Sequence, residues 1–218
     1  MPSVPVRRCV TPFACLWLVV TAMAGTVSAQ SRLNCQAPQR PSIGGVFGRS
    51  SPSAELSRGV IDLHQWESAT LEGGPLLGAR ADASLAGPLR VRLEGSTTWW
   101  HIVRRTYSPE PNYGVVATTS AGRMSMRQLV ASVGLAGGRP PLCAHVMVGG
   151  GLYSLSYRDV AHRHGGFSIS AGVEVPVGRR TVLQTDVYLH VIDFPDGYPT
   201  GSTAILAAAL TAGWAFRF

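Results

Sequence analysis

Hydrophobic and polar residues alternate along most of this chain with the period of two that is typical of β-strands. The clearest example is the C-terminal segment 203–218, which is apolar at every second position and ends on an aromatic residue. Successive strand side chains point to opposite faces of a sheet, so these alternating residues form one continuous apolar surface. They are Leu206, Ala208, Leu210, Ala212, Trp214, Phe216 and Phe218. The pattern predicts a strand whose apolar face contacts lipid.

The same alternation predicts further strands, separated by turns rich in glycine and proline. They are expected at 77–85, 89–99, 129–135, 142–152, 167–177 and 183–191. One more is expected at 43–48, with 56–63 as a competing choice. Bacterial single-chain barrels have an even number of strands, and lipid offers no partner to an unpaired strand edge. The sequence therefore predicts an all-β fold, a closed antiparallel up-and-down transmembrane β-barrel of about eight strands.

The predicted connections alternate in length. Short ones are expected near 87–88, 137–141 and 178–180, and longer ones near 50–73, 104–122, 159–165 and 193–203. Outer-membrane barrels have short periplasmic turns, longer outer loops and both termini on the periplasmic side. The lengths fit this topology.

The assignment of the two faces rests on charge. A soluble periplasmic lipocalin-like carrier would also alternate, with its apolar set lining a cavity. Its outside would then be small and neutral, as at Ala207, Thr211 and Ser168, whereas soluble surfaces carry many charges. Charged residues are only 14% of the chain, against roughly 25% in typical soluble domains. The inverted arrangement, with lipid outside and charges inside, is favoured.

Charges inside a narrow barrel must be paired and hydrogen bonded. We therefore predict a polar network that fills the lumen, because a barrel of about eight strands has room for side chains but not for an open pore. Its members are Arg80, Asp82, Arg90, Arg92, Glu94, Glu174, Asp186 and His190, with Arg217 on the same face. We interpret the network as a polar core that holds strand register rather than as a gated conduit.

The N-terminus has the features of an export signal. Arg7 and Arg8 precede an apolar run at 14–24, and small residues at 27–29 fit signal peptidase. A retained transmembrane anchor is the alternative, but the run is shorter than the roughly 20 residues that a spanning helix needs. We expect a signal peptide at 1–29, a periplasmic segment at 30–41 and a barrel domain at 42–218. Cleavage lowers the formal net charge from +7 to +5.

The chain resembles the small outer-membrane β-barrel proteins of the OmpA/OmpX type. The resemblance rests on the leader, the strand pattern, the loop lengths and the closing segment Trp214-Ala-Phe-Arg-Phe218. The resemblance covers nearly all the mature chain and implies localisation in the bacterial outer membrane. It also implies that Trp214, Phe216 and Phe218 are the signal recognised by the barrel assembly machinery during insertion. The alternative for these residues is an interfacial aromatic girdle.

Other residues suggest contacts at the barrel ends. Trp99 and Trp100 are expected at the end of a strand, in an outer aromatic belt. Arginine forks suit phosphate, so the arginines of the expected outer rim make lipopolysaccharide a candidate partner besides the outer-membrane lipids. They are Arg104, Arg105, Arg123, Arg127, Arg158 and Arg163. Cys35 and Cys143 are expected at the periplasmic end, where an oxidising compartment favours a disulfide between them.

The sequence offers little support for catalysis. Lipid A deacylases use a histidine, serine and glutamate set, and this chain has neither a His-x-Ser pair nor a Gly-x-Ser-x-Gly elbow. His162 and His164 alone are weak evidence for a metal site, and no basic run indicates nucleic acid. We expect a non-enzymatic barrel with a structural or envelope-interaction role, without cofactor or metal. A lipid-modifying barrel enzyme is the alternative, and the oligomeric state is not indicated.

Overall fold

The computed structural model describes residues 41–53, 55–62, 65–107, 115–139, 142–157, 160–193 and 204–218. All of them belong to the compact unit Asn34–Phe218. The expected signal peptide and the segment 30–40 lie outside the described residues, so those predictions stay predictions. No helix in the described part of the chain is long and apolar enough to cross a bilayer.

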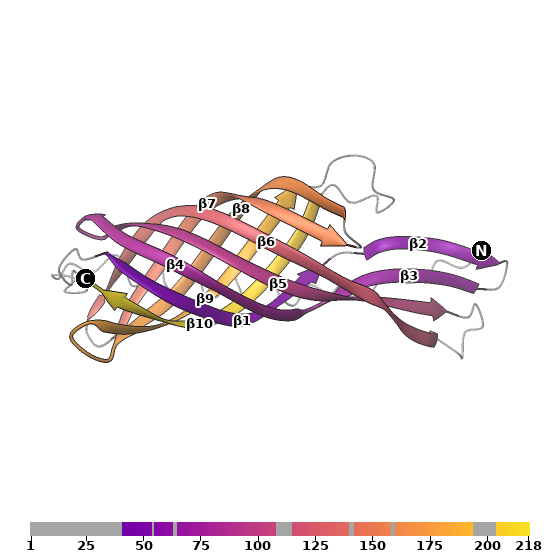
Figure 1. The fold of residues 1–218 in the computed structure, drawn as a ribbon, viewed down its shortest axis with the longest axis horizontal. Helices are drawn as coiled ribbons and strands as arrows, with labels where there is room; N and C mark the ends of the chain where they lie inside the picture. The colour runs from indigo at the N-terminus through magenta and orange to yellow at the C-terminus, as the bar shows by residue number, and fades with distance from the viewer. Residues whose placement is uncertain are drawn as a thin grey trace. The chain divides into compact units, whose positions relative to one another are not determined.

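The described residues form ten β-strands (Figure 1). Their bounds are β1 Ser42–Ser53, β2 Glu55–Asp62, β3 Gln65–Glu72, β4 Gly74–Ala86, β5 Leu89–Tyr107, β6 Val115–Arg139, β7 Leu142–Tyr157, β8 Val160–Pro176, β9 Thr181–Asp193 and β10 Ala204–Arg217.

Eight of these strands close into a ring. Its order is β1, β4, β5, β6, β7, β8, β9 and β10, and each strand is antiparallel to its neighbours. The ring closes where β1 pairs with β10, from Ser42 opposite Arg217 to Ser53 opposite Leu206. The predicted closed antiparallel barrel is confirmed. So is the strand expected at 43–48, which lies in β1.

Three of the expected outer loops, near 50–73, 104–122 and 159–165, are mostly strand, which corrects the sequence prediction. The competing segment 56–63 falls largely in β2, which pairs with β3 and takes no place in the ring. β3 in turn pairs with the far end of β5, from Trp66 opposite Tyr107 to Glu72 opposite His101. In Figure 1, β2, β3 and the ends of β5 and β6 continue past the other strands. Antiparallel pairing satisfies the backbone groups of these segments without a barrel around them.

We call this part the β-extension, defined as β2, β3, the β5 segment His101–Tyr107 and the β6 segment Val115–Arg123. It lies at the end of the barrel opposite to the C-terminal residue, since Arg217 pairs with the first residue of β1.

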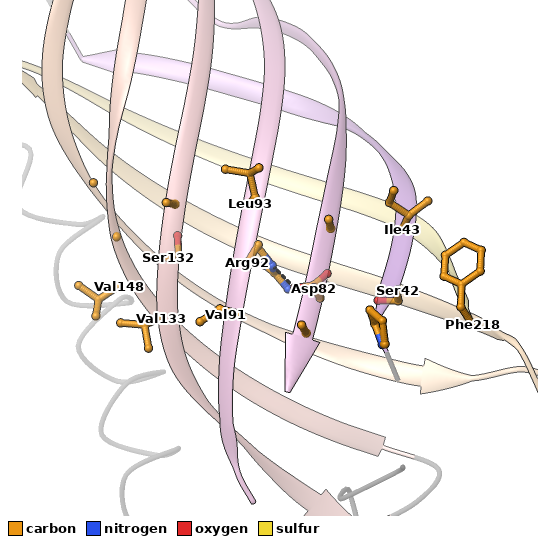
Figure 2. A pocket seen from close by; sticks show the side chains of 16 residues that line it. Ser42, Ile43, Asp82, Val91, Arg92, Leu93, Ser132, Val133, Val148 and Phe218 are labelled. Atoms are coloured by element: carbon orange, nitrogen blue, oxygen red, sulfur yellow. Dashed lines mark hydrogen bonds and ion pairs between the residues drawn. The ribbon is translucent and has the colours of Figure 1, made fainter. Parts of the chain in front are cut away.

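The wall of the barrel is apolar outside and polar inside. Neighbouring residues on β5 show the alternation, because 51% of Leu93 is exposed while only 3% of Arg92 is. On β10 the predicted apolar set faces outward, including Leu210, Trp214 and Phe216. Figure 2 shows one part of this wall, where Arg92 contacts Asp82 within a surface lined mostly by small and aliphatic side chains. The predicted orientation of the two faces is confirmed.

The buried ion pairs of the interior lie nearer the termini. Towards the β-extension, the inward positions carry a cluster of buried apolar side chains that the sequence analysis did not expect. It comprises Leu71, Trp100, Ile102, Met124, Met126, Val130, Tyr153, Leu155, Ile192, Ile205 and Ala207. Trp100 is fully buried in this cluster while Trp99 is partly exposed on the outer face. The expectation of an outer aromatic belt therefore fails for Trp100, because adjacent strand residues point to opposite faces.

A charged network across the barrel lumen

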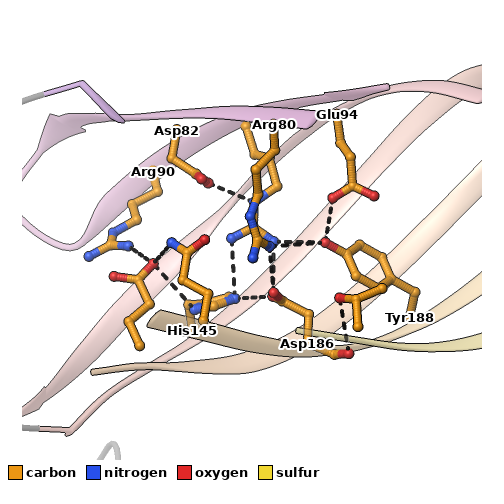
Figure 3. A network of polar contacts seen from close by, with 11 residues as sticks. Arg80, Asp82, Arg90, Glu94, His145, Asp186 and Tyr188 are labelled. Carbon is orange, nitrogen blue, oxygen red and sulfur yellow. Dashed lines mark hydrogen bonds and ion pairs between the residues drawn. The ribbon is translucent and has the colours of Figure 1, made fainter. Parts of the chain in front are cut away.

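The network begins in the hairpin of β4 and β5. Its turn contains Gly87 with φ of +52°, a left-handed conformation that favours glycine. The turn sets the register so that Arg80 lies opposite Glu94 and Asp82 opposite Arg92. All four side chains are buried. The hairpin by itself therefore brings opposite charges side by side on the inner face (Figure 3).

Asp186 on β9 is the centre of the network. Its carboxylate accepts hydrogen bonds from Arg80 Nη1 at 2.5 Å and from Arg92 Nη1 at 2.9 Å, and His145 Nε2 lies 2.5 Å from Oδ1. The side chains of Asp186 and Arg80 have no exposed area. Arg92 also donates from Nε to Asp82 at 2.6 Å.

These contacts cross the full width of the lumen. In the ring, β5 and β9 are separated by β6, β7 and β8 on one side and by β4, β1 and β10 on the other. The Arg92 to Asp186 ion pair therefore joins opposite walls. A second bridge runs beside it, where the Tyr188 hydroxyl donates to Glu94 at 2.5 Å and accepts from Arg92 at 3.1 Å. The lumen is closed by side chains at this level.

A second group of contacts surrounds Glu174 on β8, nearer the termini. Arg90 forms an ion pair with this carboxylate, and Gln184 Nε2 donates to it at 2.9 Å. Arg217 Nη2 and His145 Nδ1 each lie 3.8 Å from a Glu174 oxygen. His145 thus stands between Asp186 and Glu174 and links the two groups.

His190 is buried beside the network but forms no ion pair in the described part of the chain. Its ring stacks on Tyr188 with centroids 5.5 Å apart, and its Nδ1 lies 3.1 Å from the Tyr153 hydroxyl. All the residues proposed for the lumen therefore lie on the inner face. Within the described residues, His190 and Glu94 are the members without an ion pair, and Glu94 is held by the Tyr188 hydroxyl instead.

Sequence reasoning missed four participants, which are His145, Tyr153, Gln184 and Tyr188. A signal for them existed, because Gln184, Tyr188 and the proposed Asp186 share one parity on the same strand. What the alternation could not reveal is which inward residues meet across the lumen.

Charge is balanced within the network. Its four arginines, Arg80, Arg90, Arg92 and Arg217, face four carboxylates, Asp82, Glu94, Glu174 and Asp186. Breaking a buried ion pair by removing one partner costs about 3–5 kcal/mol, because the other charge is left uncompensated. The network therefore constrains which residues can stand at these positions.

The aromatic residues of the terminal strand lie at the seam where the ring closes. Trp214 is opposite Gly45, and a Cβ at Gly45 would lie 3.1 Å from the indole ring, so glycine leaves room for the ring. The Phe47 and Trp214 ring centroids are 6.4 Å apart. Phe216 and Phe218 are exposed on the same outer face. The arrangement joins the first and last strands, and the role of these residues as an assembly signal stays a prediction.

The cysteine and arginine predictions have separate outcomes. Cys143 is disulfide-bonded, but Cys35 lies outside the described residues, so its pairing with Cys143 stays a prediction.

The arginines of the expected outer rim differ in their surroundings. Arg158 lies outside the described residues. Arg105 donates to Glu72 at 2.5 Å and to Thr70 at 3.0 Å within the β-extension. The other members, Arg104, Arg123, Arg127 and Arg163, are exposed.

Two chemical alternatives, catalysis by a histidine beside a carboxylate and binding of a metal ion, can be compared with the geometry. His101 lies between Glu72 and Arg123 in register, but within the described residues it has no hydrogen bond, and the Glu72 carboxylate is engaged by Arg105. No group of three or more histidine, cysteine or acidic residues in the described ranges is arranged to hold a metal ion.

Comparison with known proteins identifies the fold. No protein-family model and no curated protein sequence matches the chain. Among solved structures, neisserial surface protein A (NspA) is similar with a TM-score of 0.53 and 12% identity, covering 82% of this chain and 97% of NspA. The outer membrane protein OprG from Pseudomonas aeruginosa is similar with a TM-score of 0.54 and 11% identity, covering 82% of this chain and 96% of OprG. The chain therefore has the fold of the small bacterial outer-membrane β-barrels.

Proposed function

We propose that this protein is a closed, non-conducting barrel of the bacterial outer membrane that presents its β-extension at the cell surface for contacts within the envelope. The exposed apolar wall supports insertion in a bilayer, since a continuous band of outward Leu, Val, Phe and Trp side chains is costly to expose to water. The likeness in fold to outer-membrane barrels supports the choice of membrane.

The observation that carries the closed state is the bridge between opposite walls. Arg92 on β5 binds Asp186 on β9, and Tyr188 binds Glu94 at the same level. An ion moving along the axis would have to separate these buried pairs. The apolar cluster that begins beyond them, with Trp100 and Met126 fully inside, adds a region that does not favour ions.

The β-extension supports the contact role. Loops and projecting segments on a rigid scaffold are where such proteins carry specificity. Within the described residues, β2 pairs only with β3, so its other edge is available to a partner.

Conductance in planar bilayers tests the closed state. The refolded wild-type protein is expected to leave the conductance at the bilayer baseline. The variant R92S/D186S/W100A, which shortens both side chains of the bridge and removes the indole from the apolar cluster, is expected to conduct. The matched control is E72S/R105S, which removes an ion pair of the β-extension and should stay at baseline. Steady channels from the wild type would refute the proposal. A heat-modifiable shift in gel mobility, measured on every variant, confirms that the barrel has formed.

A further inference from the structure

Three arginines stand where the apolar wall meets the β-extension. Arg127 on β6 and Arg163 on β8 are both paired in register with Ser154 of β7, so they flank that residue on the outer face. Neighbouring strands are about 4.8 Å apart, which places the two backbones roughly 10 Å from each other. Arg123 lies four residues farther along β6 on the same face. We call Arg123, Arg127 and Arg163 the arginine rim.

These arginines differ from those of the lumen, which take part in ion pairs with buried carboxylates. Within the described residues, none of the three rim side chains has a hydrogen bond or an ion pair, and all three are exposed. The described strands at this end carry the acidic residues Glu55, Asp62, Glu67, Glu72 and Asp193. The ion pair found among the described residues there joins Glu72 to Arg105 and not to the rim. The rim is therefore positively charged and not internally neutralised.

The rim also marks a border. One outward row closer to the termini, the wall carries Leu129 and Leu152, which pair in register and are 51% and 66% exposed. Trp99 is partly exposed one outward row on the other side, opposite Ser125. An indole at the edge of an apolar belt is typical of the membrane interface. The arginine rim thus lies at the level at which lipid head groups are found.

We propose that the arginine rim binds the phosphate groups of a phosphorylated glycolipid in the outer leaflet, that is, the lipid A part of lipopolysaccharide. Planar guanidinium groups form paired hydrogen bonds with phosphate oxygens. The acyl chains of the same molecule would lie against Leu129, Leu152 and the apolar wall next to them. The inference rests on the proposed function, because the end with the β-extension must face the cell exterior.

The chain provides a matched control. Arg179 and Arg180 are two exposed arginines in the turn between β8 and β9, at the opposite end of the barrel. The variants R127Q/R163Q and R179Q/R180Q each remove two positive charges. A response to R127Q/R163Q alone would reflect position rather than total charge.

Binding is measured on refolded protein in neutral detergent micelles by native mass spectrometry, as the fraction of protein carrying one lipid. The probes are bis-phosphorylated lipid A, the same lipid after removal of both phosphates, and inorganic phosphate alone. Heat-modifiable mobility is recorded first, so that loss of the barrel, which would contradict the proposed function, is distinguished from loss of the site.

We expect the wild type to bind phosphorylated lipid A and R127Q/R163Q to bind it about tenfold more weakly, as for the loss of charge-assisted hydrogen bonds worth about 1.4 kcal/mol. R179Q/R180Q should stay within about twofold of the wild type, a difference below that scale. Equal loss in both variants would overturn the site, because it would reflect net charge alone. Equal binding of dephosphorylated lipid would overturn the role of phosphate, and inorganic phosphate binding as tightly as lipid A would overturn the assignment to a lipid.

Discussion

Replacing Asp186 by asparagine removes the one carboxylate that two buried arginines share. Asparagine has nearly the same shape, so packing is preserved, but the negative charge between Arg80 and Arg92 is lost. Arg92 keeps Asp82 as a partner, whereas Arg80 keeps no ion pair among the described residues. The variant therefore isolates the electrostatic contribution of the bridge.

The expected effect on the free energy of unfolding follows from burial. Breaking a buried pair by removing one partner costs about 3–5 kcal/mol. Because Asp186 serves two guanidinium groups, we expect D186N to lie near the upper end of that range. An exposed pair contributes less than about 1 kcal/mol, and Glu72 and Arg105 form such a pair, with 47% and 32% of their side chains exposed. E72Q is therefore the control.

The assay is reversible urea unfolding of the protein in lipid vesicles, followed by tryptophan fluorescence. R80Q and R80Q/D186N complete a double-mutant cycle, in which coupled residues deviate from additivity by about 0.5–3 kcal/mol. We expect the double variant to be less destabilised than the sum of the two single variants, since the second substitution removes a charge that the first left unpaired. A D186N effect no larger than that of E72Q, or an additive cycle, would refute the assigned role of the network.

Three further predictions concern the seam, a turn and the disulfide. Trp214→Ala should lower the free energy of unfolding by about 0.5–1.5 kcal/mol through lost aromatic packing. Phe218→Ala should leave the stability in urea unchanged and slow only the insertion that the assembly machinery assists. Equal slowing of unassisted insertion would contradict the role of Phe218 as an assembly signal. Gly87→Val should destabilise the barrel by at least about 1–2 kcal/mol, because the φ of Gly87 is left-handed. Gly178→Val is the control, since a Cβ at Gly178 would meet open space, and it should be nearly neutral in the same urea titration. Alkylation with and without reduction should change the peptide mass at Cys143, and tandem mass spectrometry should find it linked to Cys35; a link to any other cysteine would remove that pairing.

The alternation of residue types determined the fold class of this protein. Leu93 and Arg92 are neighbours in sequence, and the period of two is sufficient to place one outside and the other inside, whichever strands lie beside them. Lipid admits no open strand edge, so alternating strands with an apolar outer face imply closure. The outward orientation of the aromatic side chains in β10 could also be predicted from the sequence, because these residues stand at alternate positions of one strand.

Only the tertiary structure decided what the inward residues do. Arg92 and Asp186 are 94 residues apart in sequence, and their contact depends on the register of every strand between them around the ring. The pattern likewise could not show that Trp100 and Met126 pack inside, since a closed wall shields apolar and polar side chains from water alike. The β-extension was missed because its strands are ordered by pairing with β5 beyond the barrel, a long-range interaction that local residue type does not encode.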